Sequence, residues 1–244
     1  MLIHLILVAP ARAENVGAAA RAMKTMGFSS LRIVDSEVHK LPQAEWVAHG
    51  AQDILDEAES YETLSDALAD IDFSVATTAR ERAKFKYYCE PDELVQILTE
   101  KAQYAGNVAL VFGREATGLT NEELELVDLL TGVPMANHYP SLNLGQAVMV
   151  YCYQLSKLTG ELMMPDQHQA ESETETEEAP AEHKESLGAL RVLRSRAHQL
   201  LHDIGVADDL KLADWLDQRL GFLEQRDIAM LHTLLQDIEK SVKK

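Results

Sequence analysis

Positions 108 to 124 read Val108-Ala109-Leu110-Val111-Phe112-Gly113-Arg114-Glu115-Ala116-Thr117-Gly118-Leu119-Thr120-Asn121-Glu122-Glu123-Leu124. The first five residues are apolar, which predicts a buried strand that stops at Gly113. Thr120 is a candidate helix N-cap, and Glu123 stands three residues later, as a capping box requires. The stretch therefore predicts a strand, a turn that exposes Arg114 and Glu115, and a helix. Open α/β sheets form their ligand sites where such strands end.

Two further segments repeat this arrangement of glycine and polar residues between a strand and a helix. Asn15, Gly17 and Arg21 follow an apolar run, and Ser141-Leu142-Asn143-Leu144-Gly145 opens a later apolar segment. Gly17 is expected to let a substrate or another chain approach the backbone. Three loops of this kind in one small domain predict a composite site.

The first 160 residues alternate between strand and helix patterns. Strands are expected over 3–8, 31–34, 73–77, 108–112 and 130–133, and helices over 15–26, 44–49, 61–69, 91–104, 120–126 and 144–159. Strands that are separated by helices predict an α/β fold with a mostly parallel sheet and helices on both faces.

Composition places the chain among globular proteins. At 244 residues with 46% hydrophobic residues, it can form one core with an appendage. Cys89 and Cys152 show no metal-ligand spacing, so we expect reduced thiols, no metal and a cytoplasmic location. The apolar run over residues 2–9 is too short for a membrane span and predicts the first strand.

Charge and composition divide the chain into three parts. Residues 1–160 form the α/β domain, and 161–185 form a linker whose positions 165–185 hold eight acidic residues and one lysine. Positions 165–185 contain no large apolar residue that could offset their ordering entropy, which predicts disorder. Residues 186–244 show three amphipathic patterns, over 186–204, about 208–220 and about 224–242, which predict a small all-α appendage.

A basic segment interrupts the acidic domain. The net charge of the chain is −18, which argues against binding a polyanion except through a local patch. Arg80, Arg82, Lys84 and Lys86 alternate with other residues, and Phe85, Tyr87 and Tyr88 lie among them. In an extended loop this spacing puts the four cations on one side. The segment is either an RNA contact made of phosphate-binding and stacking side chains, or a solvated loop.

The glycine spacing also invites a nucleotide-binding interpretation, which the neighbouring residues exclude. Gly113 and Gly118 have the spacing of a P-loop, in which lysine and then serine or threonine follow the second glycine. Here Leu119-Thr120 follows, so the lysine that would reach a phosphate is missing. No GxGxxG motif follows the first strand, so a dinucleotide-binding fold is not supported.

Together, the three loops resemble those of the SPOUT-class RNA methyltransferases, in the branch that methylates ribose 2′-hydroxyls of tRNA and rRNA. The first motif of that family has the form N-x-G-x-x-x-R, the second F-G-x-E-x-x-G-L, and the third contains S-L-N before a helix. Their order and spacing match over about residues 1 to 160. Here the motifs are Asn15-Gly17-Arg21, Phe112-Gly113-Arg114-Glu115 with Gly118-Leu119, and Pro140-Ser141-Leu142-Asn143.

The resemblance implies a fold, a cofactor and an oligomeric state. The fold includes a C-terminal trefoil knot, one of the rare exceptions to unknotted chains. The implied cofactor is S-adenosylmethionine, and the implied partners are RNA, with tRNA favoured over rRNA, and a second copy whose subunit completes each site. Helices 15–26 and 144–159 are the expected dimer interface. The implied cofactor-binding residues are Thr77, Thr78, Ala79, Gly113, Val133, Tyr139, Pro140, Ser141 and Leu142.

The resemblance also implies four catalytic residues, Arg21, Asn15, Glu115 and Asn143. A guanidinium keeps its proton in a protein, so Arg21 is expected to clamp a phosphate and stabilise alkoxide charge rather than act as a base. Asn15 is expected to orient the ribose, and Glu115 to fix either Arg21 or the Asn143 amide.

Three alternatives remain open on the sequence alone. One is methylation of a base instead of a sugar, and another is an RNA-binding module of the same fold without catalysis. The third is an acidic scaffolding protein that acts through its C-terminal helices.

Overall fold

The computed structural model describes residues 1–79, 88–136, 141–159 and 189–206, and parts of 212–242. Several predictions therefore concern positions outside the described residues. These are the proposed RNA contacts Arg80, Arg82, Lys84 and Lys86, the proposed cofactor contacts Tyr139 and Pro140, and the acidic linker.

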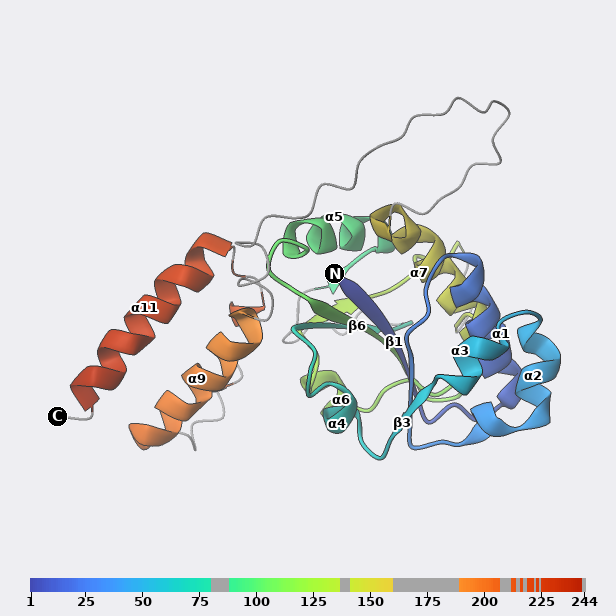
Figure 1. The fold of residues 1–244 in the computed structure, drawn as a ribbon, viewed down its shortest axis with the longest axis horizontal. Coiled ribbons are helices and arrows are strands. Elements are labelled where there is room, and N and C mark those ends of the chain that lie inside the picture. Colours follow the sequence, from blue (N-terminus) through green and yellow to red (C-terminus); the bar gives the residue numbers. More distant parts are fainter. Residues whose placement is uncertain are drawn as a thin grey trace, which may run out of the picture.

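A parallel sheet forms the centre of the domain (Figure 1). It has seven strands in the order β3-β2-β1-β6-β4-β7-β5. Every strand pair that is resolved runs in parallel. The strands are β1 (Leu2–Val8), β2 (Leu31–Val34), β3 (Glu59–Tyr61), β4 (Phe73–Thr77), β5 (Tyr88–Cys89), β6 (Asn107–Phe112) and β7 (Leu129–Thr131).

Some helices connect the strands, and others come after the last strand in the sequence. They are α1 (Ala13–Thr25), the 3-10 helix η1 (Val38–Lys40), α2 (Pro42–Ala48), α3 (Gln52–Asp56), α4 (Leu64–Ala67), α5 (Pro91–Lys101), α6 (Asn121–Glu125), α7 (Leu144–Thr159), α9 (Ala189–Asp203) and α11 (Gln225–Val242). None of the helices in the described part of the chain combines the length and apolar content that a membrane span requires.

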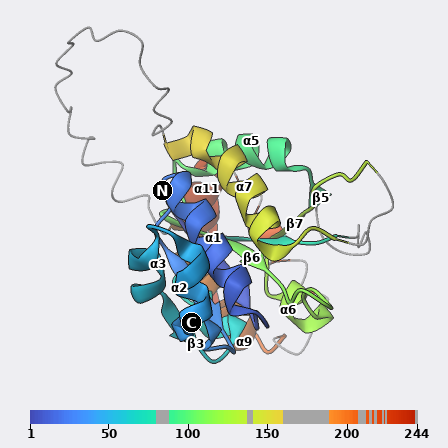
Figure 2. The ribbon, with the colours of Figure 1, turned by 90° about the vertical axis from the view of Figure 1, so that its right-hand side faces the viewer.

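The sheet is covered on both faces, as the alternation of strands and helices predicts. Along β1, Leu5 and Leu7 point into one apolar core, and Ile6 and Val8 point into the other. Helices α1, α2, α3, α5 and α7 contribute to the first core, and α4 and α6 to the second. Figure 2 shows α1 and α7 on one side of the strands and α6 on the other. The predicted α/β class is therefore confirmed.

One predicted helix is wrong. The segment 61–69 divides into the end of strand β3 and the short helix α4. Tyr61 pairs in register with Val34 at the edge of the sheet. The helix begins only at Leu64, where the hydroxyl of the N-cap residue Thr63 accepts the Asp66 amide at 3.2 Å. Helix α3 and strand β5 escaped prediction because five and two residues are too few for a periodic pattern.

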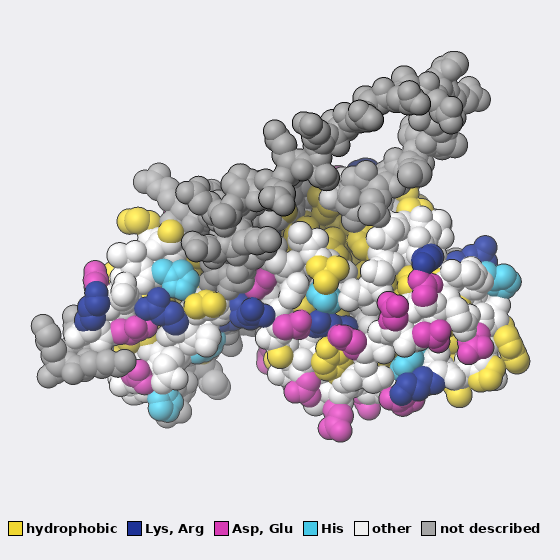
Figure 3. Space-filling view, viewed as in Figure 1, with side chains coloured by type: hydrophobic (Ala, Val, Ile, Leu, Met, Phe, Trp, Pro, Cys, Tyr) yellow, Lys and Arg dark blue, Asp and Glu magenta, His cyan; other side chains and the backbone are white. Residues whose placement is uncertain are grey.

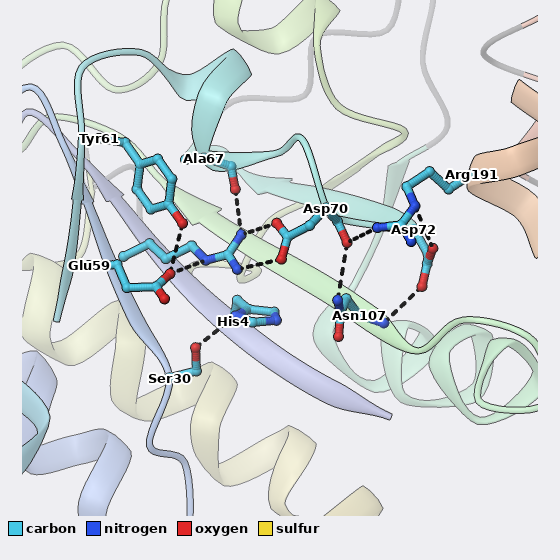
Figure 4. Close-up of polar contacts among 10 residues, drawn as sticks. His4, Ser30, Glu59, Tyr61, Ala67, Asp70, Asp72, Asn107 and Arg191 are labelled. Atoms are coloured by element: carbon cyan, nitrogen blue, oxygen red, sulfur yellow. Dashed lines mark hydrogen bonds and ion pairs between the residues drawn. The ribbon is translucent and has the colours of Figure 1, made fainter. Parts of the chain in front are cut away.

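A buried arginine ties the second face of the sheet together. Arg32 in β2 is 3% exposed. Its guanidinium donates to both carboxylate oxygens of Asp70, at 2.6 and 2.8 Å, and to the carbonyl of Ala67 at 2.7 Å. Figure 4 shows this cluster beside His4 and Tyr61. Because the guanidinium is paired and hydrogen-bonded, its burial is tolerated next to an apolar core.

The C-terminal helices pack against the end of the sheet where strands β4, β6 and β7 begin. Arg191 in α9 donates to the carbonyl of Asp70 at 3.0 Å and lies 4.0 Å from the Asp72 carboxylate (Figure 4). Three residues further along, Arg194 forms an ion pair with Asp128. Two successive turns of α9 thus contact two buried carboxylates.

A buried lysine adds to this contact. Lys101, at the end of α5, donates to the carbonyl of Gly221 and lies over the Phe73 ring, 4.4 Å from its centroid. Burial lowers the pKa of Lys101 to about 8, although the nearby Asp128 carboxylate opposes the shift. The appendage is therefore joined to the α/β domain through charged groups as well as apolar ones.

The trefoil knot stays a prediction. A knot depends on how the chain passes through its own loops. The segments that join β4 to β5 and β7 to α7 run through residues 80–87 and 137–140, outside the described residues.

The pair between Arg194 and Asp128 predicts a stability effect. We expect Arg194→Ala to lower the free energy of unfolding by about 3 kcal/mol, because it leaves a buried carboxylate without its counter-charge. The double variant Arg194→Met with Asp128→Asn should lose less than Arg194→Ala alone. Urea unfolding followed by circular dichroism measures both. An unfolding midpoint of Arg194→Ala equal to that of the unaltered chain would show that α9 does not dock through this pair.

Candidate functional site

Three loops that lie far apart in the sequence meet at the carboxyl edge of the sheet. The Asn15 side-chain amide donates to Glu115 at 2.8 Å, and the Asn143 amide donates to the Asn15 carbonyl oxygen at 2.9 Å. Glu115 follows strand β6, Asn15 lies in the first turn of α1, and Asn143 directly precedes α7. The three predicted catalytic side chains therefore form one hydrogen-bonded chain, which we call the relay.

The remaining contacts of the relay fix the loops themselves. Glu115 also accepts the backbone amide of Ala11 at 3.0 Å, and the Asn143 carbonyl oxygen accepts the amide of Gly145 at 2.9 Å. Within this chain, Glu115 makes no direct hydrogen bond to Arg21 or Asn143 among the described residues. Glu115 binds Asn15 instead, and Asn143 is held through Asn15, because Asn15 lies between the other two.

Glu115 remains charged in this setting. Partial burial raises its pKa, but hydrogen bonds from Asn15 and from the Ala11 amide outweigh that effect and leave the pKa below the ordinary value. An ionised carboxylate can only accept hydrogen bonds. It therefore determines which end of the Asn15 amide faces it.

The turn after β6 is shaped by two glycines. A Cβ on Gly113 would lie 2.4 Å from the backbone of Gly118 and Leu119, so only glycine fits there. Gly118 has a φ of +70°, which an L side chain rarely adopts. The amide of Gly118 donates to the carbonyl of Arg114 at 2.8 Å and closes the turn.

The predicted capping box is present at the start of α6. The Thr120 hydroxyl accepts the Glu123 amide at 3.2 Å, and the Glu123 carboxylate accepts the Thr120 amide at 2.8 Å. Glu123 also binds the Arg114 guanidinium through two hydrogen bonds, at 2.9 and 3.0 Å. Arg114 is therefore paired to the helix, while its neighbour Glu115 faces the relay.

A cavity of about 450 Å³ opens beside the relay, between the ends of β4, β6 and β7. Glu115 belongs to its wall. All predicted cofactor contacts that the structure describes line it, namely Thr77, Thr78, Ala79, Gly113, Val133, Ser141 and Leu142. Their role as cofactor ligands stays a prediction, but the structure brings them to one cavity.

Sequence reasoning missed much of the apolar lining. Phe112, Leu119, Leu124 and Tyr151 also face the cavity, and the rings of Phe112 and Tyr151 meet edge to face with centroids 5.8 Å apart. The apolar periodicity marks such residues as core. The sequence contains no signal that distinguishes a core residue from one at the base of a cavity.

The lining suits S-adenosylmethionine. Of the described residues that line the cavity, Arg114 is the one cation, and it is paired with Glu123. A positively charged sulfonium would therefore meet the ionised Glu115 rather than a free cation. Backbone groups of the glycine turn and the strand ends supply donors and acceptors for the adenine and ribose, and the apolar residues supply a face for the adenine ring.

Arg21 lies outside this cavity. It stands six residues after Asn15 in α1, which places it roughly 9 Å further along the helix and about 120° around it. Its side chain is exposed. Among the described residues, no hydrogen bond or ion pair holds its guanidinium. The structure therefore does not join Arg21 to the relay of its own chain.

The expectation for Gly17 is wrong. A Cβ on Gly17 would lie 2.1 Å from the carbonyl oxygen of Ala44, so this glycine allows α1 and α2 to pack closely and offers no backbone to a substrate. Gly145 acts in the same way between α7 and α1, where a Cβ would lie 2.7 Å from that of Ala18.

Comparison with known proteins agrees with the fold and the site. Residues 2–153 match the SpoU rRNA Methylase family, and residues 187–242 match the C-terminal domain of the tRNA/rRNA methyltransferase LasT. LasT of Escherichia coli K12, described as an uncharacterized tRNA/rRNA methyltransferase, is 59% identical over 244 residues, all of both chains.

Two proteins called TrmJ are also similar. The tRNA (cytidine/uridine-2′-O-)-methyltransferase TrmJ of Klebsiella pneumoniae is 38% identical over 178 residues, which cover 73% of this chain and 71% of TrmJ. The crystal structure of TrmJ from Z. mobilis ZM4 matches with a TM-score of 0.67 at 28% identity, over 98% of this chain and 100% of that one.

The sheet, the relay and the cavity define a methyltransferase of the SPOUT class. The chain belongs to the SpoU methylase family. Membership of this family confirms the predicted RNA methyltransferase activity, and a methylase family agrees with S-adenosylmethionine as the methyl donor.

The glycine turn predicts a selective loss of cofactor binding. We expect Gly113→Ala to weaken S-adenosylmethionine binding at least tenfold, because the added Cβ displaces Gly118 and Leu119 from the cavity wall. Isothermal titration measures the affinity, and thermal unfolding shows whether the fold persists. Unchanged affinity in a folded Gly113→Ala variant would contradict the assignment of this turn to the cofactor.

Proposed function

We propose that this protein transfers a methyl group from S-adenosylmethionine to a ribose 2′-hydroxyl of tRNA. The observation that carries the proposal is the relay of Glu115, Asn15 and Asn143 at the rim of the cavity. The names of the TrmJ relatives support both the 2′-oxygen and tRNA as the acceptor. We keep Arg80, Arg82, Lys84 and Lys86 as proposed RNA contacts.

The chemistry requires alignment more than activation. S-adenosylmethionine supplies an electrophilic methyl group on a good leaving group. The amides of Asn15 and Asn143 each retain a second N–H beyond the one used in the relay, and these can hold the oxygens of the ribose. Holding the acceptor in line can contribute about 7 kcal/mol to lowering the barrier. Arg21 stabilises negative charge on the 2′-oxygen or an adjacent phosphate. The proton of the 2′-hydroxyl passes to that phosphate or to water as the methyl carbon moves from sulfur to oxygen.

Methyl transfer to total tRNA, followed by nucleoside analysis, tests this proposal. We expect 2′-O-methylated nucleosides, and a loss of at least 100-fold in rate for Asn15→Ala, since orienting groups contribute factors of this size. A ring-methylated product would instead identify a base methyltransferase. Binding of RNA and cofactor without any methylated product would identify a non-catalytic module.

We also propose that the protein acts as a homodimer. A second cavity, of about 580 Å³, lies between the end of α1, the start of α5 and one face of α7. Its lining is mainly apolar and includes Met26, Pro91, Pro134, Met149 and Tyr153. Tyr153 is 56% exposed. Association of two copies would cover this surface. It lies beside helices α1 and α7, the interface that the family resemblance implies.

In such a dimer Arg21 acts in the site of the partner subunit. This arrangement would explain why Arg21 is exposed and lies outside the cavity of its own chain. Each site would then combine the relay and cavity of one chain with Arg21 of the partner subunit.

Two variants test the dimer. We expect Tyr153→Glu to shift the protein from dimer to monomer in light scattering, because a charge in an apolar interface is costly to bury. Trp46→Glu is the matched control, since Trp46 is exposed on α2 away from this surface. A monomeric parent protein would contradict the proposal.

Mixing defective chains tests the shared site. Chains with Arg21→Ala and chains with Gly113→Ala should each be inactive, but a mixed dimer contains one site with both an intact cavity and an intact arginine. Co-expressed chains should therefore recover activity in the mixed dimer. No recovery in isolated mixed dimers would place Arg21 in the site of its own chain.

The remaining proposals concern organisation and location. We propose the division into residues 1–160, 161–185 and 186–244. We also propose a cytoplasmic location, which two buried cysteines without a disulfide support.

A further inference from the structure

We propose that Arg12 binds a phosphate of the RNA next to the methylated ribose. This inference rests on the proposed function and assigns a substrate contact outside the three family motifs. It depends on three observations: the position of Arg12 in the backbone next to Asn15, the lack of a partner for its guanidinium among the described residues, and the negative charge of the surrounding domain.

Arg12 is attached at the relay itself. It is the N-cap residue of α1 and stands three positions before Asn15. The Glu115 carboxylate accepts the amide of the preceding residue, Ala11, at 3.0 Å. The same carboxylate therefore holds both Asn15 and the backbone from which the Arg12 side chain extends. Movement of one relative to the other is restricted.

The guanidinium of Arg12 is available. Its residue is exposed, and no hydrogen bond or ion pair to it occurs among the residues that the structure describes. Most of the other described cations of the α/β domain differ in this respect. Lys24 pairs with Asp53, Arg32 with Asp70, Lys40 with Glu37, and Arg114 with Glu123.

The acidity of the domain makes it informative that Arg12 has no carboxylate partner among the described residues. Figure 3 shows Asp and Glu side chains spread over the visible face of the domain, with fewer Lys and Arg side chains among them. On such a surface a carboxylate partner is easily found, and the described cations listed above have one. Lys101 and Lys157 donate to neutral oxygens instead, those of Gly221 and Gln154. Among the described cations of positions 1–159, Arg12 and Arg21 are therefore the two whose side chains have no partner within the described residues, and they lie at the N-cap and within α1, the helix that carries Asn15.

An RNA phosphate fits this position best. An arginine presents paired N–H donors that match phosphate oxygens, and it remains charged at any physiological pH. Asn15 and Asn143 are placed to contact the ribose, so a cation held three residues from Asn15 is placed to meet the backbone attached to that ribose. Phosphate contacts of this kind determine register and carry no base preference.

The test compares Arg12→Ala, Arg12→Lys and Lys40→Ala in the full-length protein. We expect Arg12→Ala to raise the KM for tRNA five- to tenfold, with kcat and the affinity for S-adenosylmethionine unchanged. The slope of log affinity for tRNA against log salt concentration should fall by about 0.7 to 1, the loss of one phosphate contact. Arg12→Lys should keep the slope and recover part of the affinity. Lys40→Ala removes an exposed cation that already has a carboxylate partner, and should change neither quantity.

The outcomes separate this inference from the proposed function. A salt slope of Arg12→Ala equal to that of the parent, in a protein that methylates tRNA, would overturn the role of Arg12 alone. A reduced slope in a protein that binds tRNA but makes no 2′-O-methyl product would support the phosphate contact and overturn the proposed reaction. An equal loss of slope in Lys40→Ala would show a general charge effect and would also overturn the inference.

Discussion

The site depends on one ionised carboxylate. Glu115 can only accept hydrogen bonds, so the Asn15 side chain must turn its amide nitrogen toward it and its oxygen away. That oxygen accepts the Asn143 amide, and the Asn143 oxygen then accepts the amide of Gly145. One charge therefore sets the orientation of two amides and holds the start of α7 against α1. Protonation of Glu115 would remove this directionality, and its lowered pKa keeps the relay intact into the acidic range.

Close helix packing allows so short a relay. Asn15 lies in α1 and Asn143 directly before α7, and their side chains meet because the backbones of α1 and α7 approach where Gly145 faces Ala18. Gly17 allows a similar approach on the other side of α1, where Ala44 lies. A sequence motif alone suggests that glycine serves the ligand. Here both glycines allow helices to pack closely. The close approach of α7 to α1 brings the side chains of Asn15 and Asn143 within hydrogen-bonding distance.

The sequence predicts features that depend on residues close together in the chain better than features that depend on residues far apart in the chain. The strands over 108–112 and 31–34 and the capping box at Thr120 follow from local patterns, and the structure contains them. Helix α4 and strand β3 were mistaken for one helix because the boundary depends on pairing with Val34 at the edge of the sheet. Docking of the appendage could not be predicted, because Arg194 and Asp128 are 66 residues apart and neither belongs to a motif. The family motifs identify the relay residues, but the order of their hydrogen bonds requires the structure.

The charge of the chain is less of an obstacle to RNA binding than its net value suggests. A protein of net charge −18 repels a polyanion at long range, but screening confines that repulsion to about 8 Å at physiological salt. Within that distance, local pairing decides. Arg114 is neutralised by Glu123, whereas Arg12 and Arg21 carry uncompensated charge on α1 among the described residues. They stand nine residues apart, about 13 Å along the helix axis, so one helix presents cations to two different places. If Arg12 serves the site of its own chain and Arg21 that of the partner subunit, then dimerisation would give each site both cations while most of the surface stays acidic.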